Sequence, residues 1–129
     1  MIYLDSAAVV KLVRLEPGTT ALVDWLNART GVPLLSSALV EVEVPRALRR
    51  GAPAALPAVP GTLARLYRLE MDATVRTAAG GLPDPTLRSL DAIHVATALQ
   101  IGDRLQAFVT YDARLLAVAR QAGLPAVSP

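Results

Sequence analysis

Short apolar runs separated by longer stretches of helical periodicity recur along the whole sequence. Five runs are short enough to be buried strands, and we predict strands at residues 2–4, 33–36, 69–71, 105–109 and 125–127. Strands that alternate with helices form a parallel sheet that carries helices on both faces. The pattern therefore predicts a single α/β domain over residues 1–129, with a mostly parallel five-stranded sheet.

The segments between the strands have apolar residues at spacings of three and four, which is typical of helices. We predict helices at residues 7–15, 19–29, 37–50, 62–67, 72–79, 84–101 and 113–121. Ser6 and Asp84 are predicted to cap the first and sixth of these helices. Pro45 should kink the third helix or mark a restart. Residues 51–61 contain three prolines, so we expect a loop with irregular turns there.

Two aspartates occupy matching positions in this pattern. Asp5 and Asp112 each follow an apolar strand and precede a helix. Taken alone, each fits an N-cap, a position that aspartate fills well. However, ligands of open α/β sheets bind at the carboxyl ends of the strands. We therefore predict that both carboxylates lie at one edge of the sheet, in a shared functional site.

Asp91 lies in a predicted helix that is apolar on nearly every side. Such a helix is mostly buried, and a buried carboxylate is costly unless it meets a cation, a metal ion or several donors. Arg88, one turn earlier, or His94, one turn later, could supply that partner, and a metal ion is the alternative. We expect His94 itself to be a satisfied, semi-buried side chain and not a ligand.

Glu41 and Glu43 are the candidates for a fourth acid. They are two residues apart in the third predicted helix and therefore about 200° apart around its axis. Both fall at the edges of the apolar stripe formed by Val40, Val44 and Leu48, one on each side. Periodicity alone does not choose between them.

Carboxylates held close together raise one another's pKa values unless a cation neutralises them. The chain has no cysteine and one histidine, which excludes thiol chemistry and Cys/His zinc sites. An ion held by oxygen atoms would be Mg²⁺ or Mn²⁺. Such ions bridge a phosphodiester and activate water, so the acids predict phosphodiester hydrolysis. Motifs of dinucleotide, P-loop and serine-hydrolase sites are absent.

The charge permits a nucleic-acid substrate without demanding one. The formal net charge is +2, and twelve of the 13 basic residues are arginine. Arginine suits bidentate phosphate contacts, although a compositional bias toward arginine explains the excess equally well. No uncharged apolar stretch reaches the length of about 18 residues that a membrane span needs. We read no signal peptide, and we expect a cytoplasmic protein without membrane contact.

Four sequence blocks, in this order, resemble PIN domains of the VapC toxin type. They are IYLDSAAVVKL at 2–12, SSAL running into VEV and RAL between 36 and 48, LRSLDAIHVATAL at 87–99, and VTYD at 109–112. The third block is the most specific. Together the blocks span nearly the whole chain.

The resemblance implies a three-layer α/β/α sandwich and a metal-dependent endoribonuclease that acts as the toxin of a toxin–antitoxin pair. It also implies RNA as the substrate, a VapB-type antitoxin as partner and a homodimer. The sequence alone leaves two alternatives open. One is a PIN-fold binding module without activity, and the other is a DNA-directed nuclease of the same superfamily.

The resemblance also implies roles for individual residues. The acidic quartet would be Asp5, Glu43, Asp91 and Asp112, which resolves the choice between the two glutamates in favour of Glu43. We expect Asp5 and Asp91 to be the inner metal ligands, with the other two acids binding directly or through water. Hydroxyls that support the carboxylates would be those of Ser6 and Thr110. Candidate RNA-phosphate contacts are Arg14, Arg46 and Arg88, for each of which a solvated surface arginine is the alternative.

Overall fold

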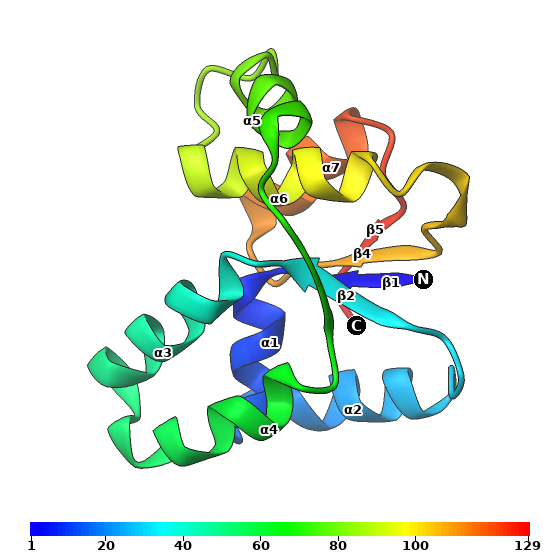
Figure 1. Ribbon diagram of the computed structural model, residues 1–129. Coiled ribbons are helices and arrows are strands. Elements are labelled where there is room, and N and C mark those ends of the chain that lie inside the picture. The colour runs from blue at the N-terminus through cyan, green and yellow to red at the C-terminus, as the bar shows by residue number, and fades with distance from the viewer.

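A computed structural model describes residues 1–129 and shows one five-stranded parallel sheet (Figure 1). Its strands are β1 (Ile2–Leu4), β2 (Leu34–Ser37), β3 (Tyr67–Leu69), β4 (Ala107–Val109) and β5 (Ala126–Val127). They lie in the order β3-β2-β1-β4-β5, and every neighbouring pair is parallel. The order of connection reverses between β1 and β4. Their carboxyl ends are therefore the expected place for a ligand.

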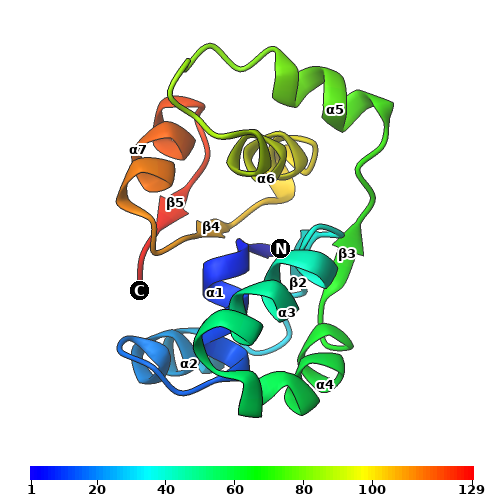
Figure 2. The ribbon, with the colours of Figure 1, turned by 90° about the vertical axis from the view of Figure 1, so that its left-hand side faces the viewer.

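Helices cover both faces of this sheet, as the three-layer prediction requires. On one face lie α1 (Ser6–Val13), α2 (Thr19–Asn27), α3 (Val40–Gly51) and α4 (Val59–Leu63) (Figures 1 and 2). On the other face lie α5 (Ala73–Gly80), α6 (Ser89–Leu99) and α7 (Ala113–Gln121). None of these helices combines the length and the apolar character needed to cross a membrane.

The central strand β1 contributes to both cores because successive side chains of a strand point to opposite faces. Ile2 and Leu4 belong to the core under α1 to α4, while Tyr3 belongs to the core under α6 and α7. All three side chains are fully buried. A strand buried on both faces explains the uninterrupted apolar run at the start of the sequence.

The predicted start of the sixth helix is wrong. α6 begins at Ser89, and Asp84 instead accepts hydrogen bonds from the backbone N–H and the hydroxyl of Thr86, both at 2.8 Å. Such local side-chain bonds compete with helix formation, so residues 84–88 form a turn. Asp91 consequently lies in the first turn of α6 and not in its middle.

The segment predicted as an irregular loop is largely helical. Residues 51–61 include a 3₁₀ helix, η1 (Pro53–Ala58), and the start of α4. Pro53 and Pro60 stand in the first turns of these helices, where proline loses no hydrogen bond. The predicted helix at 62–67 and strand at 69–71 are therefore shifted, because α4 ends at Leu63 and β3 spans Tyr67–Leu69. A second 3₁₀ helix, η2 (Gly102–Arg104), follows α6.

Pro45 does not restart the third helix. α3 runs from Val40 to Gly51 with Pro45 inside it. The missing N–H of Pro45 would have bonded the carbonyl of Glu41, four residues earlier. Glu41 is an exposed residue, so water can satisfy its carbonyl and the helix can continue.

Leu22 provides a test of the core beneath α1 to α4. Its side chain is fully buried, whereas Leu15 is 85% exposed. Replacing Leu22 with Ala should lower the free energy of unfolding by about 3 kcal/mol, because burial is lost and a cavity remains. Leu15→Ala is the matched control and should change it by less than about 0.5 kcal/mol. Urea denaturation measures both, and equal losses would contradict this packing.

Candidate active site

The four predicted acids line one cavity at the carboxyl edge of the sheet. The cavity has a volume of about 490 Å³, and its walls come from the β1–α1 junction, α3, the start of α6 and the residues after β4. The residues that line it include Asp5, Ser6, Glu43, Arg46, Arg50, Arg88, Asp91, His94 and Asp112. In the arrangement seen, no three His, Asp or Glu side chains are grouped closely enough to hold one metal ion.

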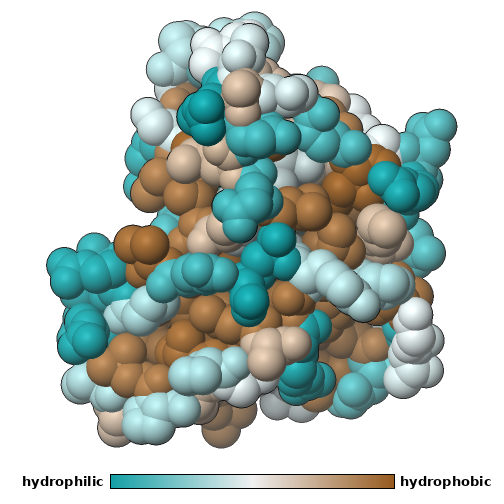
Figure 3. All heavy atoms as spheres, in the orientation of Figure 1, coloured by the Kyte–Doolittle hydropathy of each residue, from teal (hydrophilic) through white to brown (hydrophobic).

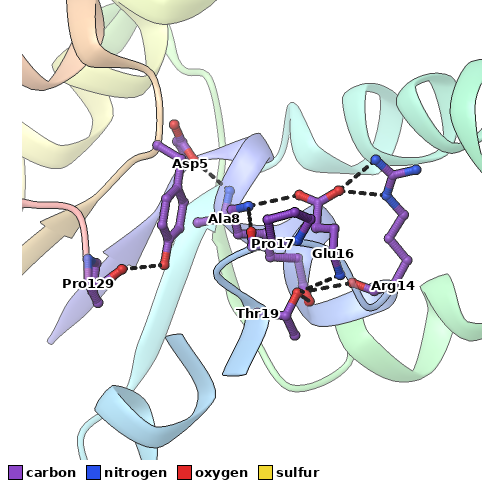
Figure 4. Close-up of polar contacts among 9 residues, drawn as sticks. Asp5, Ala8, Arg14, Glu16, Pro17, Thr19 and Pro129 are labelled. Carbon is purple, nitrogen blue, oxygen red and sulfur yellow. Dashed lines mark hydrogen bonds and ion pairs between the residues drawn. The ribbon is translucent and has the colours of Figure 1, made fainter. Parts of the chain in front are cut away.

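Asp5 both caps a helix and faces the cavity. Its Oδ1 accepts a hydrogen bond of 2.8 Å from the backbone N–H of Ala8, so Asp5 and not Ser6 is the N-cap of α1 (Figure 4). The residue is 3% exposed and has no ion-pair partner. Burial raises the pKa of Asp5, although hydrogen bonds from Thr110 and Ala8 oppose that shift.

Asp112 repeats this arrangement at the start of α7. Its Oδ1 accepts a hydrogen bond of 2.9 Å from the backbone N–H of Leu115. Its own N–H donates to the hydroxyl of Thr110 at 3.1 Å. Thr110 is fully buried and contacts both aspartates, which places it where a supporting hydroxyl was expected. The cap and the functional site, posed as alternatives by the sequence, coincide at both positions.

Asp91 lines the cavity from the first turn of α6, and not from the middle of a buried helix as the sequence predicted. Its position in the first turn of α6 is favourable for a carboxylate, because the positive end of the helix dipole lies there. Arg88 Nε donates to Asp91 Oδ2 at 3.0 Å, and Arg88 Nη2 lies 3.6 Å from Asp112 Oδ2. The Arg88 side chain is 71% exposed, so one solvated guanidinium bridges two acids of the site.

The two glutamates of α3 have different surroundings. Glu43 lines the cavity, where its Oε2 accepts hydrogen bonds from Ser6 Oγ and from His94 Nε2, the latter at 2.8 Å. Glu41 points elsewhere and pairs with Arg68 at 2.8 Å. Partial burial alone would raise the pKa of Glu43, but the hydrogen bonds from His94 and Ser6 outweigh it and hold that pKa below its usual range.

Two arginines of α3 and one that precedes α6 line the cavity. Arg46 and Arg88 were expected there, whereas Arg50 was missed, although it lies one helical turn beyond Arg46. Arg14 does not line the cavity, because both its Nε and its Nη2 pair with Glu16, at 2.7 and 2.6 Å (Figure 4). That ion pair leaves Arg14 without an evident role in phosphate binding.

The donor set fits a hard divalent cation. Arg88 supplies the positive charge for Asp91 and Asp112, and His94 hydrogen-bonds Glu43. Asp5 is a buried carboxylate without an ion-pair partner of its own. Carboxylate oxygens are the ligands that Mg²⁺ and Mn²⁺ prefer, and an ion at this position would relieve the charge that burial leaves on Asp5.

Known proteins are similar to this chain in both sequence and fold. The model of the PIN domain family matches residues 2–121. The chain belongs to the PIN domain family. Ribonuclease VapC35 of Mycobacterium tuberculosis is 52% identical to it over 100% of this chain and 97% of the relative. Ribonuclease VapC46 of the same species is 44% identical over 99% and 97%, respectively.

Solved PIN-domain structures agree with the fold. The crystal structure of VapC20 from M. tuberculosis, described as a toxin that cleaves the sarcin-ricin loop, superposes with a TM-score of 0.75 at 18% identity over 100% of both chains. VapBC2 of Rickettsia felis, crystallised with a promoter DNA fragment, gives a TM-score of 0.71 at 16% identity over 99% of this chain and 98% of that chain. The predicted VapC-type PIN domain and its three-layer α/β/α sandwich are confirmed.

The raised pKa of Asp5 predicts a stability change in metal-free protein. An acid whose pKa is raised by folding favours the protonated form, so stability falls as pH rises above the ordinary value of 3.8. Asp5→Asn removes that charge and keeps the cap of α1. The variant should therefore be more stable than the original protein at pH 7 in EDTA. The difference should vanish at acid pH, where Asp5 is protonated.

Urea denaturation between pH 3 and 7, with both proteins in the same chelator, measures this difference. A variant that is less stable than the original protein at pH 7 would contradict the prediction. It would mean that the ionised Asp5 carboxylate gains more from its hydrogen bonds than it loses through burial.

Proposed function

We propose that this protein is a Mg²⁺- or Mn²⁺-dependent endoribonuclease and the toxin of a type II toxin–antitoxin system. The observation that carries the proposal is the convergence of four carboxylates, from four separate segments, on one arginine-lined cavity at the carboxyl edge of the sheet. The relatives of 52% and 44% identity are named ribonucleases, which supports RNA as the substrate.

Each acid has a defined place in the proposed mechanism. Asp5 and Asp91 would hold the ion directly, while Glu43 and Asp112 would complete the site directly or through water. A bound Mg²⁺ or Mn²⁺ would supply an activated water and stabilise the leaving oxygen of the phosphodiester. The hydroxyls of Ser6 and Thr110 would orient the carboxylates of Glu43 and Asp5, to which they donate hydrogen bonds, while Thr110 also accepts from the backbone N–H of Asp112.

Arginines at the cavity wall would bind the RNA backbone. Arg46 and Arg50 belong to α3, and Arg88 is the N-cap residue of α6. Because Arg88 is largely exposed, its ion pairs with Asp91 and Asp112 are weakly held. Arg88 would therefore leave the two acids when a cation takes its place, and its guanidinium would then be free to pair with a phosphate oxygen.

The two rival functions differ in measurable ways. A PIN-fold binding module without activity would not need four acids around one cavity. A DNA-directed nuclease would use the same acids, because nothing in the cavity distinguishes ribose from deoxyribose by itself. The names of the relatives favour RNA over DNA.

Cleavage of matched RNA and DNA hairpins tests this proposal. Purified protein freed of any antitoxin should cut the RNA with Mn²⁺ or Mg²⁺ and lose all activity in EDTA. Asp91→Asn and Glu43→Gln should each lower the cleavage rate by at least about 100-fold, because losing a metal ligand costs no less than the 10- to 100-fold loss caused by changing a residue that orients a ligand. Glu41→Gln is the matched control and should retain activity, since Glu41 faces away from the cavity.

Absence of cleavage at every metal concentration would support the binding module. Equal cleavage of both hairpins would support a nuclease activity but contradict specificity for RNA. Loss of activity in the Glu41 variant, with retention in the Glu43 variant, would reverse the assignment of the fourth acid.

We also propose that the protein forms a homodimer and is held by a VapB-type antitoxin. The R. felis neighbour is itself a VapBC assembly. Figure 3 shows apolar and hydrophilic side chains interleaved over the face drawn in Figure 1. The large exposed apolar residues Val42 and Leu90 both line the acidic cavity, so an antitoxin that covered them would also block the acids.

Light scattering coupled to gel filtration should give the purified protein a mass twice the 13.6 kDa of one chain. The product of an antitoxin reading frame beside the gene should bind it and suppress RNA cleavage. A mass of 13.6 kDa at all concentrations would contradict the proposed homodimer but not the proposed antitoxin partner.

A further inference from the structure

His94, the single histidine of the chain, lies at the centre of a buried chain of side chains behind Glu43. It is 2% exposed and belongs to α6. Its Nδ1 lies 2.7 Å from the hydroxyl of Tyr3 on β1. Its Nε2 lies 2.8 Å from Glu43 Oε2 on α3 and 3.0 Å from Ser6 Oγ on α1. One imidazole thus joins four elements of the fold.

The positions of the protons in this chain follow from its partners. The hydroxyl proton of Ser6 is donated to Glu43 Oε2, so the Ser6 oxygen can only accept from His94. An ionised carboxylate also only accepts. Nε2 of His94 must therefore carry a proton, which it shares between Glu43 and Ser6. Nδ1 faces Tyr3, and that contact fixes the other end of the ring.

The ring that holds Glu43 is itself held by the core of the sheet. Tyr3 is fully buried and stacks on Phe108 of β4, with ring centroids 5.2 Å apart and planes within 6°. The His94 ring meets Tyr3 edge-on, with centroids 5.9 Å apart. A glutamate side chain loses considerable rotamer freedom when it is ordered. Here a rigid buried support holds Glu43 before any ligand arrives.

We propose that His94 is a positioning residue that orients the Glu43 carboxylate for metal binding through its Nε2–H. The proposal rests on the proposed function, in which Glu43 is one of the metal ligands. It goes further, because it assigns a role to a residue that would not bind the ion itself and that the sequence predicted to be a satisfied, semi-buried side chain. Groups that orient metal ligands are worth about 10- to 100-fold in affinity.

Two amide substitutions separate positioning from packing. Glutamine places an amide nitrogen near the position of Nε2, so His94→Gln keeps a donor for Glu43. Asparagine is shorter and reaches only the position of Nδ1, so His94→Asn keeps a partner for Tyr3 but leaves Glu43 without its donor. Both variants remove the ring from the core, and both should therefore lose similar stability in urea denaturation of metal-free protein.

Mn²⁺ binding by calorimetry then reads the positioning role without any measurement of activity. His94→Asn should bind Mn²⁺ about 10- to 100-fold more weakly, whereas His94→Gln should retain most of the affinity. Glu43→Gln should weaken binding as well. The double variant that combines His94→Asn with Glu43→Gln should bind no more weakly than Glu43→Gln alone, because both changes act through one carboxylate.

The outcomes distinguish failure of this inference from failure of the proposed function. Normal Mn²⁺ affinity in H94N, together with weakened affinity in E43Q, overturns the positioning role and leaves the proposed site intact. Normal affinity in E43Q itself removes Glu43 from the proposed ligands. Equal loss of affinity in H94N and H94Q shows a packing role alone and also overturns the inference.

Imidazole ¹⁵N spectra of the unmodified protein provide a test that needs no variant. The chain has one histidine, so the signals are assigned without ambiguity. We expect a protonated Nε2 in metal-free protein, and a change in its chemical shift on addition of Mg²⁺ that E43Q abolishes. A tautomer with a bare Nε2 would overturn the inference.

Discussion

Mutual repulsion among four carboxylates around one cavity is the constraint on which the rest of this structure depends. Carboxylates that face one another in a partly buried site cannot all remain ionised unless positive charge or hydrogen-bond donors compensate them. The chain compensates these acids in three ways. Helix N-termini donate to Asp5 and Asp112, a guanidinium pairs with Asp91, and a buried imidazole with a hydroxyl holds Glu43.

These compensations are unequal, and the inequality indicates where a cation belongs. Asp91 and Asp112 share an exposed arginine that can leave at little cost. Asp5 is the most buried of the four and has donors but no ion-pair partner, so its pKa is raised. A site that is stable without its ion would hold every acid as firmly as Glu43 is held. This site instead leaves uncompensated charge at its deepest point, which favours function at the expense of stability.

The sequence predicted the acids better than it predicted their surroundings. Asp5 and Asp112 could be placed because the end of a buried strand is visible as an apolar run followed by a helical pattern. Asp91 was selected by its apolar neighbours, although its helix begins later than predicted and the residue lies in the first turn. The choice of Glu43 over Glu41 needed family resemblance, because position on an amphipathic helix does not show which neighbour a side chain will meet.

The contacts that could not be predicted are those between distant segments. His94 meets Glu43, Ser6 and Tyr3 across 51, 88 and 91 residues of sequence, and no local pattern encodes such a network. The helices of residues 53–63 were missed for a local reason. Three prolines in this segment resemble a loop, but Pro53 and Pro60 occupy first turns of helices, where proline is tolerated.

The central strand β1 links the two hydrophobic cores to the acids of the site. β1 sends Tyr3 into one core and Ile2 and Leu4 into the other, and then ends at Asp5. Tyr3 supports the imidazole behind Glu43, so the same three-residue strand determines the positions of two acids that come from different elements. A change in the packing of Tyr3 would therefore act on Glu43 through His94 of α6. The acids of the site are thus linked through the core of the protein and not only through the cavity they share.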